Sequence, residues 1–75
     1  MVNNMSINQK IVEKILECFK NTNRDLTLKE IAEKTGLTRT TIRTYLVYLL
    51  ATGKIEETRQ IGKSKFYKLK NKNQT

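Results

Sequence analysis

The stretch between residues 27 and 53 constrains the fold of this chain most, because it predicts two short helices separated by a tight turn. After Thr27, apolar residues recur three and four positions apart, which is the spacing of one buried helix face. Thr27 and Glu30 have the spacing of a capping box, which satisfies free amide groups at the start of a helix. Gly36 fits the left-handed position that commonly ends a helix, so the first helix stops there and a second one follows.

The second helix of this pair, about residues 39–52, begins with a cluster of threonine and arginine. Its inner face is predicted from Ile42, Leu46 and Leu49, and Gly53 ends it. The polar cluster comprises Thr38, Arg39, Thr40, Thr41, Arg43 and Thr44. A helix that serves only for packing has little use for so many polar and cationic side chains in its first turns. The cluster therefore predicts an exposed helix end that can enter a nucleic-acid groove, with Thr38 also acting as N-cap.

A further helix is predicted before this pair, from a capping box at Ser6 and Gln9 to about Asn21. Its apolar residues cover roughly half of the helix circumference, which is wider than a single packing surface usually needs. They are Ile7, Ile11, Val12, Ile15, Leu16, Cys18 and Phe19. Either the extra width forms a homodimer interface, or neighbouring helices and strands of the same chain cover it. The small core that a chain of 75 residues can build favours a dimer.

In the last third of the chain the apolar pattern changes from helical spacing to alternation. Residues 55–61 and 65–69 predict two strands of a β-hairpin, joined by a short turn that contains glycine. Tyr67 and Leu69 alternate onto one face, which we expect to pack on the helices. A short extended segment near Leu26 can add a third strand. The predicted fold class is α+β, with three helices followed by a two-stranded β-hairpin.

Charge is distributed unevenly along the chain. Fifteen lysine and arginine residues oppose seven aspartate and glutamate residues, which gives a formal net charge of +8 at pH 7. Residues 1–38 carry six basic and five acidic side chains, whereas residues 39–75 carry nine basic and two acidic ones. This segregation predicts a polyanionic partner, since a merely solvated surface does not explain where the charge lies. The length predicts a single domain, residues 1–75, with frayed ends at 1–5 and 71–75.

The composition argues against catalysis and metal binding. The chain has no histidine and one cysteine, so it cannot assemble a zinc site, a Cys–His nucleophile or a histidine base by itself. That cysteine, Cys18, forms no intramolecular disulfide, and its place on the apolar stripe favours a buried, inert residue over a redox switch. No apolar run is long enough for a signal peptide or a membrane span. We expect a non-enzymatic cytoplasmic protein without metal, cofactor, membrane contact or small-molecule ligand.

Taken in order, these motifs make the chain resemble the winged helix-turn-helix family of DNA-binding regulators. The resemblance covers about residues 26–69, and residues 6–21 fit the first helix of that family. It is carried by Leu28, Ile31 and Ala32 on the supporting helix, Gly36-Leu37-Thr38 in the turn, Thr41-Ile42-Arg43 with Leu46 and Leu49 on the recognition helix, and Gly53-Lys54-Ile55, Tyr67 and Leu69 in the hairpin. The resemblance implies that the hairpin is a wing, that the partner is double-stranded DNA, and that the protein is usually a homodimer on a palindromic operator. Ile61 departs from the pattern at the wing tip, where polar residues are commoner, so it contacts a partner or covers the end of the sheet.

The predicted recognition helix offers side chains for both bases and phosphates. Arg43 lies nearer the outward face and is expected to bind a guanine, while Arg39 is better placed for a phosphate. Thr40 and Thr44 offer a hydroxyl to a base and a methyl group to thymine. Each assignment has a plainer alternative, and for Arg43 it is an ion pair with an acidic side chain of the same chain.

The remaining candidates lie at the helix start and on the wing, residues 59–65. Thr38 and Thr41 are near free helix amides, where phosphate binds readily, although Thr38 can serve only as a cap and Thr41 only as a surface residue. We expect four wing residues on the phosphate backbone or in the adjacent minor groove. They are Arg59, Lys63, Ser64 and Lys65.

Sequence-specific binding of double-stranded DNA by a transcriptional regulator is the leading prediction, with a homodimer formed through the first helix and a location at the nucleoid. Two other classes stay open. One is a winged-helix adaptor that binds an acidic protein, and the other is a non-specific architectural binder of nucleic acid. The lack of aromatic residues interleaved with basic ones argues against recognition of single strands.

Overall fold

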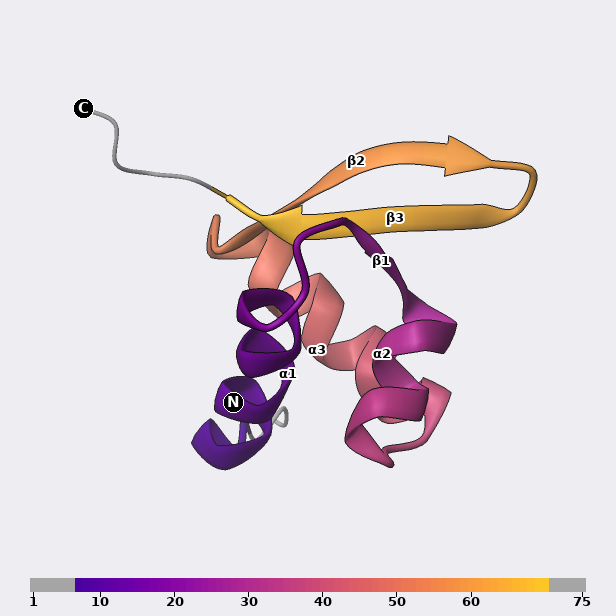
Figure 1. The fold of residues 1–75 in the computed structure, drawn as a ribbon. Helices are drawn as coiled ribbons and strands as arrows, with labels where there is room; N and C mark the ends of the chain where they lie inside the picture. The colour runs from indigo at the N-terminus through magenta and orange to yellow at the C-terminus, as the bar shows by residue number, and fades with distance from the viewer. Residues whose placement is uncertain (1–6, 71–75) are drawn as a thin grey trace.

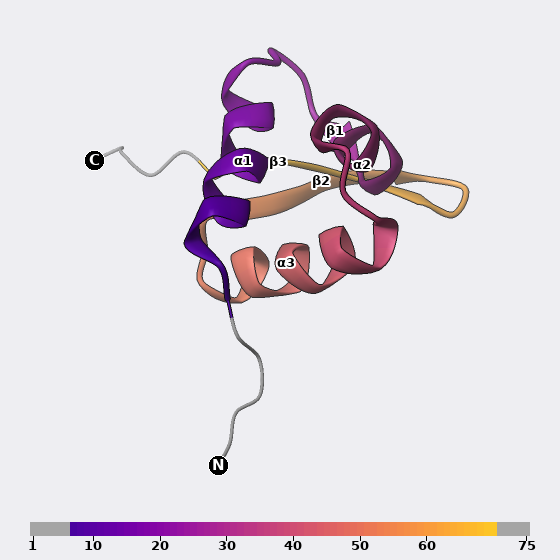
Figure 2. The same ribbon diagram turned by 90° about the horizontal axis from the view of Figure 1, so that it is seen from below.

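The computed structural model describes residues 7–70, so the predicted frayed ends and Ser6 lie outside this range. Its elements follow in the order α1 (Gln9–Lys20), β1 (Leu26–Thr27), α2 (Leu28–Thr35), α3 (Arg39–Ala51), β2 (Ile55–Ile61) and β3 (Ser64–Leu69). Within residues 7–70, three helices lie against one face of an antiparallel sheet, and the far end of the β2–β3 hairpin extends past them (Figures 1 and 2). The predicted α+β class is confirmed, and the segment at Leu26 does form a third strand.

Both ends of α2 and the start of α3 form as their local sequence predicts. Thr27 Oγ1 accepts from the Glu30 amide at 3.2 Å, and the Glu30 carboxylate accepts from the Thr27 amide at 3.0 Å, which completes the capping box. Gly36 ends α2 with φ +76°, the left-handed conformation expected there. Thr38 caps α3 by accepting from the Thr41 amide at 3.2 Å. The turn between the two helices is therefore specified by residues within a few positions of it.

The start of α1 differs from the prediction. The helix begins at Gln9, and its N-cap is Asn8, whose side-chain oxygen accepts from the Lys10 amide at 2.9 Å. The predicted capping box of Ser6 and Gln9 is therefore wrong. The physical reason is a tertiary contact, because the Asn8 amide donates to the Tyr45 hydroxyl on α3 at 2.8 Å and so holds Asn8 at the helix end.

The wide apolar stripe of α1 is covered within the chain. Val12, Ile15 and Phe19 are buried, and the other apolar positions of the stripe are partly buried and pack against the core. Apolar width is thus no longer an argument for a dimer through this helix. Cys18 is half-buried, and burial, which outweighs the opposing charge of Lys34, raises the pKa of its thiol. A raised thiol pKa agrees with the predicted inert cysteine.

The sheet has the strand order β1-β3-β2, so β3 is the central strand. β1 pairs with β3 at Leu26↔Tyr67 and Thr27↔Phe66. On the other side, Tyr67 pairs with Glu57 and Phe66 pairs with Arg59, which leaves Thr58 between them as a β-bulge. β3 begins at Ser64, one residue earlier than predicted, because Ser64 pairs with Ile61. The hairpin turn is therefore one residue shorter than predicted.

Core residues come from all three helices and from the base of the sheet. Ile15, Ile31, Ile42, Leu49 and Ile55 are essentially inaccessible to solvent. The predicted packing of β3 on the helices is confirmed, since Tyr67 and Leu69 are partly buried against this core. No helix in the described range is long and apolar enough to cross a membrane. Residues 7–70 also contain no group of three or more acidic, histidine or cysteine side chains that could hold a metal ion.

Candidate nucleic-acid interface

Helix α3 presents a mostly polar side to solvent because most of its apolar residues are buried on the other side. Ile42, Leu46 and Leu49 are buried, as predicted for the inner stripe, and Tyr45 is buried beside them. The exposed side chains between them come from the threonine and arginine cluster and its continuation. They are Arg39, Thr40, Arg43, Thr44 and Val47. The first turns of the helix therefore carry hydrogen-bonding and cationic groups on an accessible surface.

A groove of about 520 Å³ lies between α3, the start of α2 and the wing. Its cationic side chains come from three separate elements. They are Lys29 on α2, Arg39 and Arg43 on α3, and Lys63 and Lys65 on the wing. Its apolar side chains are Leu28, Leu46, Val47, Leu50 and the ring of Tyr67. The fold thus gathers basic residues of three elements, which lie between positions 29 and 65, into one concave basic surface, which we call the basic groove.

The structure brings together five of the ten predicted contact residues in this groove. Arg39 and Arg43 from α3 line it together with Lys63, Ser64 and Lys65 from the wing. The four threonines Thr38, Thr40, Thr41 and Thr44 do not line it. The Thr38 hydroxyl donates to the Thr41 hydroxyl at 3.0 Å, so both side chains are engaged at the helix cap. Thr40 and Thr44 are exposed on α3 outside the groove.

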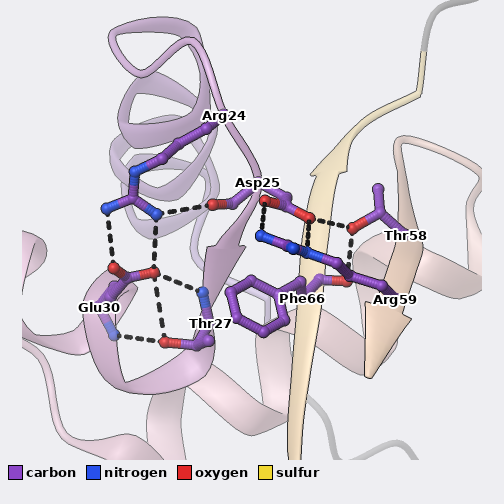
Figure 3. Close-up of polar contacts among 7 residues, drawn as sticks. All are labelled: Arg24, Asp25, Thr27, Glu30, Thr58, Arg59 and Phe66. Atoms are coloured by element: carbon purple, nitrogen blue, oxygen red, sulfur yellow. Dashed lines mark hydrogen bonds and ion pairs between the residues drawn. The ribbon is translucent and has the colours of Figure 1, made fainter. Parts of the chain in front are cut away.

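Arg59, the tenth predicted residue, is held by the protein itself. Its guanidinium donates from Nε and Nη2 to the carboxylate of Asp25 at 3.0 and 3.2 Å, and lies 4.4 Å from the ring centroid of Phe66 (Figure 3). Arg59 therefore lies outside the basic groove, and its charge is already matched by a carboxylate. By contrast, Arg43 takes part in neither ion pair of residues 7–70, so the alternative role of an intramolecular partner is not observed there.

The sequence prediction did not include several residues that line the basic groove. Glu57 is the acidic side chain among the lining residues. Strand alternation from Ile55 was the available signal, because Glu57 lies two residues later and pairs with Tyr67. Burial, followed by the charge of Glu57, raises the pKa of the Tyr67 hydroxyl, while Arg43 opposes the shift. Lys29 carried no local signal, since its place beside the groove depends on how α2 packs.

Two exposed apolar residues stand out on this side of the molecule and on the wing. Val47 on α3 is 61% exposed and lines the basic groove, and Ile61 near the wing tip is 57% exposed. Ile61 therefore does not cover the end of the sheet, which was one of its two expected roles. The other expected role, contact with a partner, is left as the prediction.

The fold and this surface define a winged helix-turn-helix DNA-binding domain. The sequence matches the IclR helix-turn-helix domain over residues 13–59, which is more than half of its length, and the chain belongs to that family. No curated protein sequence gives a significant match. The crystal structure of the apo-Zalpha domain of PKZ from zebrafish has a TM-score of 0.76 and 19% sequence identity, covering 84% of this chain and 95% of that chain. At this identity the likeness concerns the fold alone.

Proposed function

We propose that this domain binds double-stranded DNA in a sequence-specific manner and acts as a transcriptional regulator. The observation that carries the proposal is the basic groove, where Arg39 and Arg43 of α3 face the same space as Lys63 and Lys65 of the wing. Basic side chains on two sides of one groove match the arrangement of phosphates along a duplex better than scattered surface lysines do. A cytoplasmic location at the nucleoid follows from the proposed partner.

The proposed contacts of α3 follow from its exposed first turns. The major groove of B-DNA is about 12 Å wide and admits one helix, whose N-terminal residues reach the base edges. Arg43 has no ion-pair partner within residues 7–70, so its guanidinium is available for bidentate binding to guanine. Arg39, one turn earlier, is assigned to a phosphate. Thr40 and Thr44 are exposed beside them and are assigned to base edges or thymine methyl groups.

The proposed contacts of the wing are electrostatic. Lys63 and Lys65 are exposed at and beside the hairpin turn, and Ser64 lies between them. We assign these residues to the phosphate backbone or to the adjacent minor groove. Arg59 is less available for such a contact, because the carboxylate of Asp25 already neutralises its charge.

A homodimer on a palindromic site is the finer part of the proposal. Its support is the resemblance to winged helix-turn-helix regulators, which usually bind in this way. The apolar face of α1 adds no support, since the core of the same chain covers it. The mass of the protein in solution, measured free and on DNA, decides between one and two copies.

Selection of bound duplexes from a random pool tests the proposal directly, with fluorescence anisotropy on the selected site as the quantitative assay. We expect a defined consensus. If about five phosphates are neutralised per subunit, the logarithm of affinity falls with the logarithm of salt concentration at a slope of about −4 to −5. A pool that yields no consensus refutes sequence-specific binding, and a flat salt response refutes the basic groove as the DNA surface.

A further inference from the structure

A polar network on the sheet connects the start of α2 to the base of the wing, and the proposed DNA contacts do not use it. In its first half, Arg24 donates to both carboxylate oxygens of Glu30, at 3.3 and 2.8 Å, and to the backbone carbonyl of Asp25 at 3.0 Å. In its second half, the Asp25 carboxylate accepts from Arg59 and from the Thr58 hydroxyl (Figure 3). We call these five residues the wing tie.

Asp25 is the residue on which the two halves of the wing tie meet. Its side chain is 13% exposed and accepts two hydrogen bonds from Arg59 and one from Thr58. The hydrogen bond from Thr58, followed by that from Arg59, lowers the pKa of this carboxyl. The Arg59 guanidinium is also held over the ring of Phe66, which adds a cation–π contact. Asp25 therefore fixes the side chains of two consecutive residues of β2.

These two residues lie where the wing loses its other support. Thr58 is the bulged residue, and a bulge bends a strand and increases its twist. β1 pairs with β3 no farther along the wing than Phe66, so residues 60–65 form a two-stranded arm whose side chains are all exposed. An isolated two-stranded hairpin is marginally stable in water. The direction of this distal arm must therefore be set at its base.

We propose that Asp25 is a positioning residue for DNA binding, because it holds the distal arm, with Lys63 and Lys65, at a fixed angle to α3. The other end of the wing tie is anchored, since Glu30 also closes the capping box of α2 and α2 packs against α3. The tie thus joins the helix-turn-helix to the wing through side chains. For its DNA readout the inference rests on the proposed function, but the direction of the arm can be measured without DNA.

The substitution Asp25→Asn separates positioning from electrostatics, because the two predict opposite signs. It raises the net charge by one and leaves the charge of Arg59 unmatched, so electrostatics alone predicts tighter DNA binding. If the arm then occupies its binding angle about one fifth of the time, positioning predicts about fivefold weaker binding. Glu56→Gln is the matched control, because Glu56 is exposed on the same strand and takes part in neither ion pair of residues 7–70. We expect the control to bind DNA as well as the parent protein or better.

The angle itself is measured by the distance distribution between spin labels on α3 and on the arm, introduced as Thr44→Cys and Gln60→Cys in a Cys18→Ser background. We expect a broader distribution with Asp25→Asn and an unchanged one with Glu56→Gln. Thr58→Val leaves the charge unchanged and removes the hydrogen bonds that the Thr58 hydroxyl donates to Asp25 and, at 3.4 Å, to the Phe66 carbonyl. Because the Arg59–Asp25 pair remains, we expect a smaller broadening than with Asp25→Asn. This variant replaces Asp25→Asn if that one does not fold.

An unchanged distribution in a folded Asp25→Asn or Thr58→Val variant overturns the proposal, and so does an Asp25→Asn variant that binds DNA more tightly than the parent. If the parent protein fails to bind any duplex while Asp25→Asn still broadens the distribution, the proposed function fails and the positioning role of the wing tie stands.

Discussion

Replacing Arg43 with lysine tests whether this residue reads a base, because the change keeps the positive charge and removes the bidentate geometry. Arg43 is exposed, lines the basic groove and has no ion-pair partner within residues 7–70, so the change breaks no ion pair there. A bidentate arginine–guanine contact contributes about 1–3 kcal/mol of discrimination against the wrong base. That free energy corresponds to about a 5-fold to 150-fold ratio of affinities. We expect Arg43→Lys to lose most of this ratio at one base pair of the site.

The assay is a competition titration with the selected duplex and with duplexes substituted at each position, repeated at several salt concentrations. Arg43→Lys should leave the salt slope unchanged, because its charge is retained. Lys63→Gln is the matched control on the wing, and we expect it to reduce the slope by about 0.9 per subunit while leaving the ratios between sequences as they were. If Arg43→Lys keeps every ratio of the parent protein, Arg43 does not read a base and the assignment of α3 to the major groove loses its main support.

Three further predictions follow from other parts of the structure. If the exposed side chain of Ile61 makes an apolar contact with DNA, Ile61→Thr should weaken DNA binding without changing the salt slope. Unchanged affinity in the same titration would show that Ile61 does not contribute to binding. Leu49→Ala, in the inaccessible core, should lower the free energy of unfolding by about 2–5 kcal/mol, as measured by urea denaturation, and a much smaller loss would contradict the packing described. Arg24 and the Thr27 amide lower the pKa of Glu30 from its ordinary 4.5 to about 2, so the stabilising contribution of this carboxylate is complete above pH 4.5 and is lost as the pH falls toward 2. When urea denaturation is compared at pH 6 and pH 3, the free energy of unfolding should therefore fall less for Glu30→Gln than for the parent protein.

Much of the helix-turn-helix could be predicted from the sequence because its signals act over three or four residues. The capping box of Thr27 and Glu30, the left-handed Gly36 and the Thr38 cap each depend on backbone groups next to them. The N-cap of α1 could not be chosen in this way. Ser6 and Asn8 are both good capping residues, and the choice of Asn8 involves the Tyr45 hydroxyl, which lies 37 positions away.

The sequence by itself determined the fold class, the inner stripe of α3 and the cationic character of the C-terminal half, since periodicity and charge are properties of short segments. Only the tertiary structure decided which cations face the basic groove and which are neutralised. Arg59 and Lys63 looked alike as basic wing residues, yet the strand register and the bulge at Thr58 bring Arg59 to Asp25 across 34 positions. Lys63 lines the basic groove instead. Such pairings depend on how whole elements pack against one another, and the spacing of residues along the chain does not determine that packing.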